Sequence, residues 1–123
     1  MNIFQKRADA SFSLFIRLRD SEDEFCSCIS CGGIQHFTEM DCGHYRKRSH
    51  LNTRYDERNC NAQCKNCNEF MDGNEKKYEK GLIKKYGEHI INELKLLSLI
   101  EKHIGVYEYI TLIKMYKEKA RNL

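Results

Sequence analysis

The sequence predicts a mostly helical α+β domain in which a small zinc-stabilised core lies between an N-terminal helix and C-terminal helices. Three observations support this fold class: 123 residues suit one domain, apolar residues recur at helical spacing towards both ends, and two Cys-x-x-Cys pairs lie between them. We expect residues 1–25 to hold the N-terminal helix, residues 26–74 the zinc-bound core and residues 75–123 the C-terminal helices.

The outer helices are predicted from apolar periodicity and from end signals. An amphipathic helix is expected over about residues 6–19, where apolar residues share one face. The segment "NEKKYEKGLIKKYG" predicts a helix capped at its C-terminus by Gly87. Periodic segments at 88–103 and 106–123 complete the helical half, and their apolar stripes are expected to pack in the core. The stripe of the first helix consists of Ala8, Phe12, Phe15 and Ile16.

The central core is predicted as a ββα unit. The segment "IQHFTEMD" alternates well enough for a short strand. The segment "NCNAQCKNCNEFM" would place the second cysteine pair at the start of a helix that carries Asn68 and breaks at Gly73.

Composition argues against membrane and secreted proteins. Charged residues make up 32% of the chain, and no apolar run approaches the ~20 residues that a membrane helix needs. The start, "MNIFQKRADASF", lacks the apolar core of a signal peptide, so we expect a cytoplasmic protein without a membrane partner. The chain has no proline and no Gly/Ser linker, which argues against a second, flexibly tethered domain.

The paired cysteines predict a structural zinc site. Seven cysteines are an odd number, and in a reducing compartment clustered cysteines more often bind metal than form disulfides. Four thiolates at about 2.3 Å make a closed tetrahedral zinc site with no position left for water. The expected ligands are Cys28, Cys31, Cys64 and Cys67.

The remaining cysteines receive no catalytic role. Cys26 could replace Cys28 as a ligand, because "CSC" offers two thiols at the same corner. Cys42 and Cys60 are expected to be buried as small apolar side chains.

A basic segment between the cysteine pairs indicates nucleic-acid binding. Residues 43–67 carry six Lys/Arg and two Asp/Glu, a local charge of +4 against +3 for the whole chain. Arginine predominates, and its planar fork donates two hydrogen bonds to one phosphate. A solvated basic loop is the alternative, but the position beside His44 favours DNA. The candidate contacts are Arg46, Lys47, Arg48, Arg54, Arg58 and Lys65.

The order of the cysteine pairs, His44, Asn59 and Asn68 resembles the HNH, or ββα-metal, endonuclease pattern in a treble-clef zinc scaffold. A closer resemblance is to the NinG (Rap) family of phage recombination proteins. It is carried by "DCGHYRKRSH", "RYDERNCNAQCKNCNEFMDGN" and "ADASFSLFIRLRD". The resemblance implies a phage- or prophage-encoded endonuclease in a bacterial host cell, which cleaves Holliday junctions and D-loops and uses catalytic Mg²⁺ or Mn²⁺ beside structural zinc.

The resemblance also implies roles for single residues. His44 would take a proton from the attacking water, Asn59 would hydrogen-bond near His44 and hold its ring, and Asn68 would bind the catalytic ion. On a continuing helix, Asp72 would face the same way as Asn68 and add an oxygen ligand.

One position departs from the HNH pattern. Many HNH enzymes have Asp, Glu or His immediately before the base, as a metal ligand, whereas this chain has Gly43. Asp41 and Asp72 are the nearest carboxylates that could substitute. His44 has two alternative roles besides that of the base: it could itself be a metal ligand, or it could be a structural histidine.

Two other function classes stay open at this point. The chain could be a non-catalytic zinc-finger protein that binds DNA through the same basic segment. It could instead be an accessory factor that binds recombination proteins through its helices. A homodimer would suit paired cuts on a four-way junction.

Overall fold

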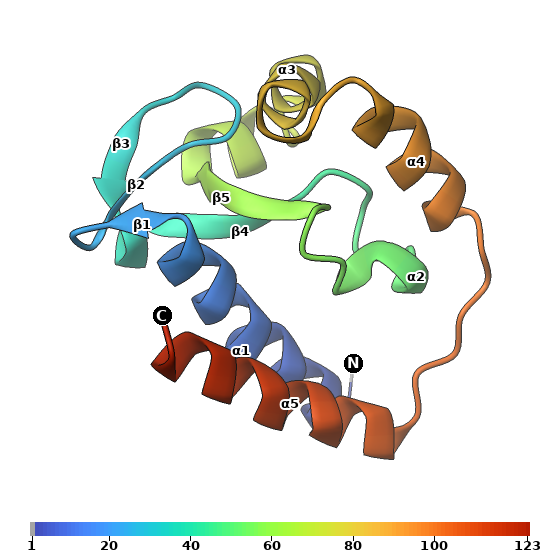
Figure 1. Cartoon of the computed structure of the whole chain (residues 1–123). Coiled ribbons are helices and arrows are strands. Elements are labelled where there is room, and N and C mark those ends of the chain that lie inside the picture. The colour runs from blue at the N-terminus through green and yellow to red at the C-terminus, as the bar shows by residue number, and fades with distance from the viewer. Residues whose placement is uncertain (1) are drawn as a thin grey trace.

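The computed structural model describes residues 2–123, and its central feature is a two-stranded hairpin enclosed by helices (Figure 1). The predicted mixed class with a predominance of helix is confirmed. None of the helices within residues 2–123 has the length and hydropathy needed to span a bilayer. The elements are α1 (Ile3–Arg19), β1 (Ser21–Glu22), β2 (Phe25–Ser27), β3 (Ile34–His36), η1 (Phe37–Glu39), β4 (Met40–His44), α2 (Leu51–Arg54), β5 (Cys60–Cys64), η2 (Asn66–Phe70), α3 (Glu75–Tyr86), α4 (His89–Ser98) and α5 (Val106–Arg121).

Helices α1 and α5 lie side by side beneath the hairpin (Figure 1). Helix α1 starts three residues earlier than predicted, because the Asn2 side chain accepts a hydrogen bond from the Gln5 amide at 2.7 Å and caps it. Its predicted apolar stripe is buried, with Phe12 and Phe15 packed against Tyr116 of α5. This pair of helices covers the face of the hairpin that carries His44.

Strands β4 and β5 pair antiparallel, with Asp41 opposite Gln63, Gly43 opposite Asn61 and His44 opposite Cys60. Because side chains alternate along a strand, Asp41 and Gly43 belong to one face and His44 to the other. Helical segment η2 follows β5 after one residue, so the chain order strand–strand–helix is present.

Two predicted elements are shorter than expected. The strand predicted at "IQHFTEMD" is interrupted by η1, which separates β3 from β4. The helix after the second cysteine pair ends at Phe70, and Asp72 adopts a positive φ of 47° in the turn that follows. Asp72 therefore does not lie one turn after Asn68 on a continuing helix. The predicted cap at Gly87 is confirmed, with φ 99°.

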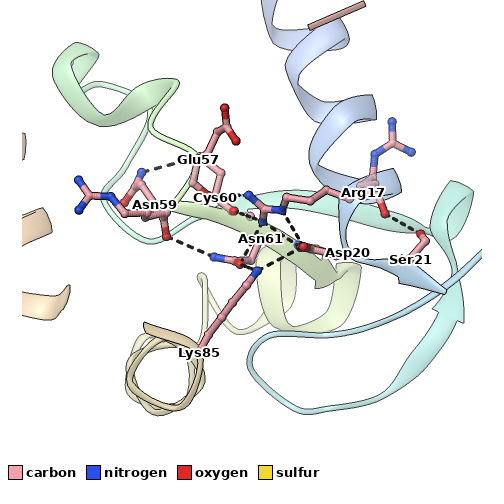
Figure 2. Close-up of polar contacts among 12 residues, drawn as sticks. Arg17, Asp20, Ser21, Glu57, Asn59, Cys60, Asn61 and Lys85 are labelled. Carbon is pink, nitrogen blue, oxygen red and sulfur yellow. Dashed lines mark hydrogen bonds and ion pairs between the residues drawn. The ribbon is translucent and has the colours of Figure 1, made fainter. Parts of the chain in front are cut away.

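A partly buried polar network fixes the hairpin between α1 and α3. Figure 2 shows Lys85 of α3 reaching Asn61 of β5 and Asp20 at the end of α1. The Lys85 Nζ atom lies 2.7 Å from Asn61 Oδ1 and 3.3 Å from Asp20 Oδ1. Arg19 donates to Asp20 at 2.8 Å and to the Cys60 carbonyl at 2.9 Å. These bonds hold β5 in place from both sides.

Candidate active site and metal centre

The two predicted cysteine pairs come together in one cluster. Their four sulfur atoms all lie within 4.8 Å of one another, and the sulfurs of Cys31 and Cys64 are 3.8 Å apart. Each sulfur accepts an N–H hydrogen bond at 3.4–3.5 Å, which favours negative charge on it. The cluster consists of Cys28, Cys31, Cys64 and Cys67.

This donor set fits a structural zinc ion. Burial raises the pKa of the Cys64 and Cys67 thiols, so the four sulfurs need a bound cation before they all lose their protons. Cys28, and not Cys26, belongs to the four-sulfur group. Cys26 is buried beside it in the apolar cluster that surrounds the site. The four cysteines could therefore hold zinc in a closed site.

A cleft of about 900 Å³ opens beside this centre. It is bordered by α1, β4, the loop after β4, and the segment from η2 to the start of α3. Seven of the residues predicted from the sequence line it: Asp41, His44, Arg46, Lys47, Arg48, Asn68 and Asp72.

His44 is held in one neutral form at the cleft wall. Its Nε2 lies 3.0 Å from the carbonyl oxygen of Arg54. A carbonyl only accepts, so Nε2 carries the proton and Nδ1 is the basic nitrogen. Burial lowers the pKa of His44 to about 4, and the positive charges of Arg48 and Arg54 act in the same direction. The ring is therefore neutral at physiological pH.

Asn59 acts differently from its prediction. Its side chain is fully buried, accepts from the Arg46 amide at 2.8 Å and donates to the Arg46 and Thr53 carbonyls at 3.1 Å. Asn59 therefore bonds near His44, as expected, but it makes no direct hydrogen bond to the His44 ring. Asn59 instead ties the two ends of the loop between β4 and β5, and a carbonyl of that loop orients His44.

Arg54 also departs from its predicted role. It is 5% exposed and pairs through two bonds with Asp9 of α1, at 3.1 and 2.6 Å. Tyr55 donates to the same carboxylate at 2.7 Å. A buried, doubly paired guanidinium does not present itself to DNA, so Arg54 is corrected from a surface contact to an anchor of the loop that holds His44.

On the opposite face of the hairpin, Asp41 and Asn68 lie together. Asn68 Nδ2 donates to Asp41 Oδ2 at 3.0 Å, and Lys65 Nζ lies 2.7 Å from Asp41 Oδ1. Because Asn68 donates through its nitrogen, its carbonyl oxygen remains for a cation. Lys65 neutralises a carboxylate here, and it does not line the cleft.

The cationic residues divide into two groups. Lys47 and Arg48 are exposed at the cleft, and Arg46 is held there by a bond from its Nε to Ser98 of α4 at 3.0 Å. Arg58 lies outside the cleft and pairs with Asp56 and Glu93 at 3.1 and 3.0 Å.

Cys60 is buried against α1 and α5, as expected for a small apolar side chain, whereas Cys42 packs against the same cluster but is only partly buried. Their sulfurs and a ring nitrogen of His44 lie within 4.8 Å of one another, a grouping of three donor atoms that the sequence did not predict. Burial raises the pKa of Cys60 far above its usual value and favours the uncharged thiol, which is a poor ligand.

The comparisons with known proteins identify the family. The family model described as Bacteriophage Lambda NinG protein matches residues 1–123. The chain belongs to the NinG family.

Relatives within the NinG family are proteins named ninG from several phages. The chain is 34% identical over 120 residues to that of Escherichia phage 933W, which covers 96% of this chain and 57% of the relative. It is 33% identical to the protein from Escherichia phage lambda and 34% identical to that from Salmonella phage P22, each again over 96% of the chain and 56% of the relative. The chain thus spans little more than half the length of these relatives. No solved structure matches it significantly.

Two residues that shape this site were not predicted from the sequence. Asp9 shares a face of α1 with buried Phe12 and Ile16, at spacings of three and seven residues, and an acid on an apolar stripe signals a buried ion pair. Gln63 contacts the backbone of Gly43 from the facing strand. Its only sequence signal was its place directly before Cys64, the first cysteine of the second Cys-x-x-Cys pair.

Proposed function

We propose that this chain is a metal-dependent endonuclease domain that cuts branched DNA, with Holliday junctions and D-loops of phage recombination as its substrates. It would act in the cytoplasm of the bacterial host cell. The arrangement of β4, β5 and η2 beside a four-cysteine cluster supports an HNH-like core of the treble-clef type. Membership of the NinG family supports a role in phage recombination.

One observation carries the proposal. A neutral histidine, a carboxylate with an amide bonded to it, and exposed cations all line a single cleft. Phosphodiester hydrolysis needs these three components: a base for the water, oxygen ligands for a cation, and positive charge for the phosphate. In this assignment they are His44, the Asp41–Asn68 pair, and the segment Arg46–Arg48.

The proposed reaction follows from these positions. His44 Nδ1 takes a proton from water, and the water oxygen bonds to phosphorus as the bond to the leaving oxygen breaks. The Arg54 carbonyl keeps the ring oriented by accepting from Nε2 and stabilises the imidazolium that forms. Lys47 and Arg48 hold the phosphate against the cleft wall. When bound at Asp41 and Asn68, Mg²⁺ or Mn²⁺ would supply positive charge for the leaving oxygen.

The donors at this position suit a hard cation. Asp41, Asn68 and Asp72 offer only oxygen atoms to it, and Mg²⁺ and Mn²⁺ prefer carboxylate and carbonyl oxygens. The sulfur cluster suits zinc. We therefore assign the two kinds of ion to separate sites.

A second basic surface supports a branched substrate. Lys77, Lys80 and Lys84 project from one side of α3 beside the zinc-binding turn, and none of them has an ion-pair partner among residues 2–123. Glu22 and Asp23 line the other side of this hollow, so the lysine side alone offers positive charge. We call these three residues the α3 lysine row. Two separate basic surfaces can contact two arms of one DNA molecule.

The test is a cleavage assay on a labelled four-way junction, with linear duplex of the same sequence as control. Zinc-loaded protein is expected to nick the junction when Mg²⁺ or Mn²⁺ is added and to leave it intact in a chelator of those ions. Binding without cutting under every divalent ion would favour the non-catalytic zinc-finger alternative. Binding that does not weaken with salt, or no binding, would favour the accessory-factor alternative.

A further inference from the structure

Gly43 stands where the resemblance to HNH enzymes places a metal-binding side chain, and the structure shows what occupies that space. A β-carbon built on Gly43 would lie 2.1 Å from the side-chain oxygen Oε1 of Gln63 and 2.8 Å from its Cβ. Both distances are far below van der Waals contact. Any side chain at position 43 would therefore have to displace Gln63, which reaches across from the facing strand β5.

The orientation of the Gln63 amide is fixed by its nitrogen. Nε2 donates to the Gly73 carbonyl at 2.8 Å and to Ser30 Oγ at 2.9 Å. A carbonyl cannot donate, so nitrogen and oxygen cannot be exchanged by rotating the amide. The oxygen is thereby directed to the Gly43 side.

That oxygen has no partner. Gln63 is fully buried, and its Oε1 is the one buried side-chain polar atom without a hydrogen bond in residues 2–123. Buried polar groups are nearly always paired, so an unpaired oxygen is free to accept from a water or to bind an ion. Gln63 also lies directly opposite Asp41 in the hairpin, and Gly73, which holds its amide, lines the cleft.

We propose that Gln63 is an oxygen ligand of the divalent cation and supplies from β5 what the residue at position 43 would supply from β4. It would act with Asp41 and Asn68, which are bonded to each other on the same side of the hairpin. Amide oxygens are ordinary ligands of Mg²⁺ and Mn²⁺. This inference rests on the proposed function, because it names a ligand of the ion that the proposed reaction needs.

The assignment explains why this chain tolerates a glycine before its base. The space beside Gly43 on this face of the hairpin has room for one oxygen donor, and either residue 43 or residue 63 can provide it. The two positions should then be exchangeable as a pair, although neither can be changed freely alone.

A pair exchange tests this directly, with Mn²⁺ binding measured by electron paramagnetic resonance in the absence of DNA. Gln63→Ala is expected to weaken Mn²⁺ binding by at least about tenfold. Gly43→Asp alone should lower the melting temperature, because the introduced side chain collides with Gln63. Gly43→Asp combined with Gln63→Ala should recover both the melting temperature and the Mn²⁺ affinity.

Gln5→Ala is the matched control, because it removes a glutamine amide that bonds Tyr109 between α1 and α5, outside the cleft. It should bind Mn²⁺ as the unaltered protein does. Unchanged Mn²⁺ affinity in Gln63→Ala, or failure of the combined variant to recover it, would overturn the assignment. If the unaltered protein nevertheless cuts junctions, only this ligand assignment fails. If it binds no Mn²⁺ and never cuts, the proposed function fails too.

Discussion

His44 owes its chemical state to residues that are distant in the sequence. Its position next to a basic segment was visible from the sequence alone, but its hydrogen bond to the Arg54 carbonyl depends on the path of a loop. Asp9 and Asn59 set that path through buried bonds. The sequence therefore predicted the histidine but not the groups that hold its ring, because hydrogen bonds to backbone carbonyls leave no pattern in residue types.

The first prediction concerns pH. Because the pKa of His44 is lowered from 6.5 to about 4, the ring stays neutral and able to accept a proton through that interval. The single-turnover cleavage rate should show no acid limb near pH 6.5, and loss of the base should begin only as pH approaches 4. A rate that falls with a midpoint near 6.5 would contradict the buried, neutral state described for His44.

The lowered pKa of His44 also makes the free energy of unfolding depend on pH. Between pH 6.5 and about 4 the unfolded chain binds a proton at His44 that the folded chain does not bind. The free energy of unfolding should therefore fall as pH falls through this interval. Urea unfolding at several pH values would measure it, and His44→Gln should lose less stability over the same range. An equal loss in both proteins would assign the effect to other groups.

At the scale of elements, the cysteine spacing was the most informative feature. Two pairs with two intervening residues each were enough to predict the four-sulfur cluster. The break predicted at Gly73 was close to the true end of the helix, but η2 already ends at Phe70 and the left-handed turn begins at Asp72, one residue before the glycine. Asp72 still lines the cleft, but from a turn and not from a helix.

The second prediction is that zinc holds β2, β5 and η2 together. Cys64→Ser should lose one equivalent of zinc per chain and unfold the centre of the domain, because structural zinc contributes roughly 10 kcal/mol or more, comparable with the whole stability of a small domain. Elemental analysis and circular dichroism would measure both effects. Cys26→Ser is the matched control: it is buried beside the cluster and should keep its zinc. Folded Cys64→Ser protein without zinc would refute the structural role.

The whole molecule presents basic groups on two surfaces, the cleft and the α3 lysine row. The net charge of +3 did not reveal this arrangement, because two of the arginines predicted to contact DNA, Arg54 and Arg58, are paired with carboxylates in the structure. The lysines of α3 appeared in the sequence only as part of an ordinary amphipathic helix. Which cations are available to DNA could be decided only from the three-dimensional structure.

The third prediction follows from these two surfaces. Replacing the α3 lysine row with alanine should weaken binding to a four-way junction more than binding to linear duplex, because only the junction can place a second arm there. The salt dependence of junction binding should decrease by roughly one for each lysine that contacts phosphate. Titrations at several salt concentrations would measure it. Equal losses for both DNA molecules would argue against the two-arm arrangement.

The central claim is that the cleft catalyses hydrolysis with His44 as its base. The most direct measurement compares His44→Ala with the unaltered protein in single-turnover cleavage of a four-way junction, with junction affinity and zinc content measured on the same preparations. We predict a rate lower by about 10² to 10⁴ with affinity and zinc unchanged. Cleavage that persists at nearly the original rate in folded His44→Ala protein would contradict the account.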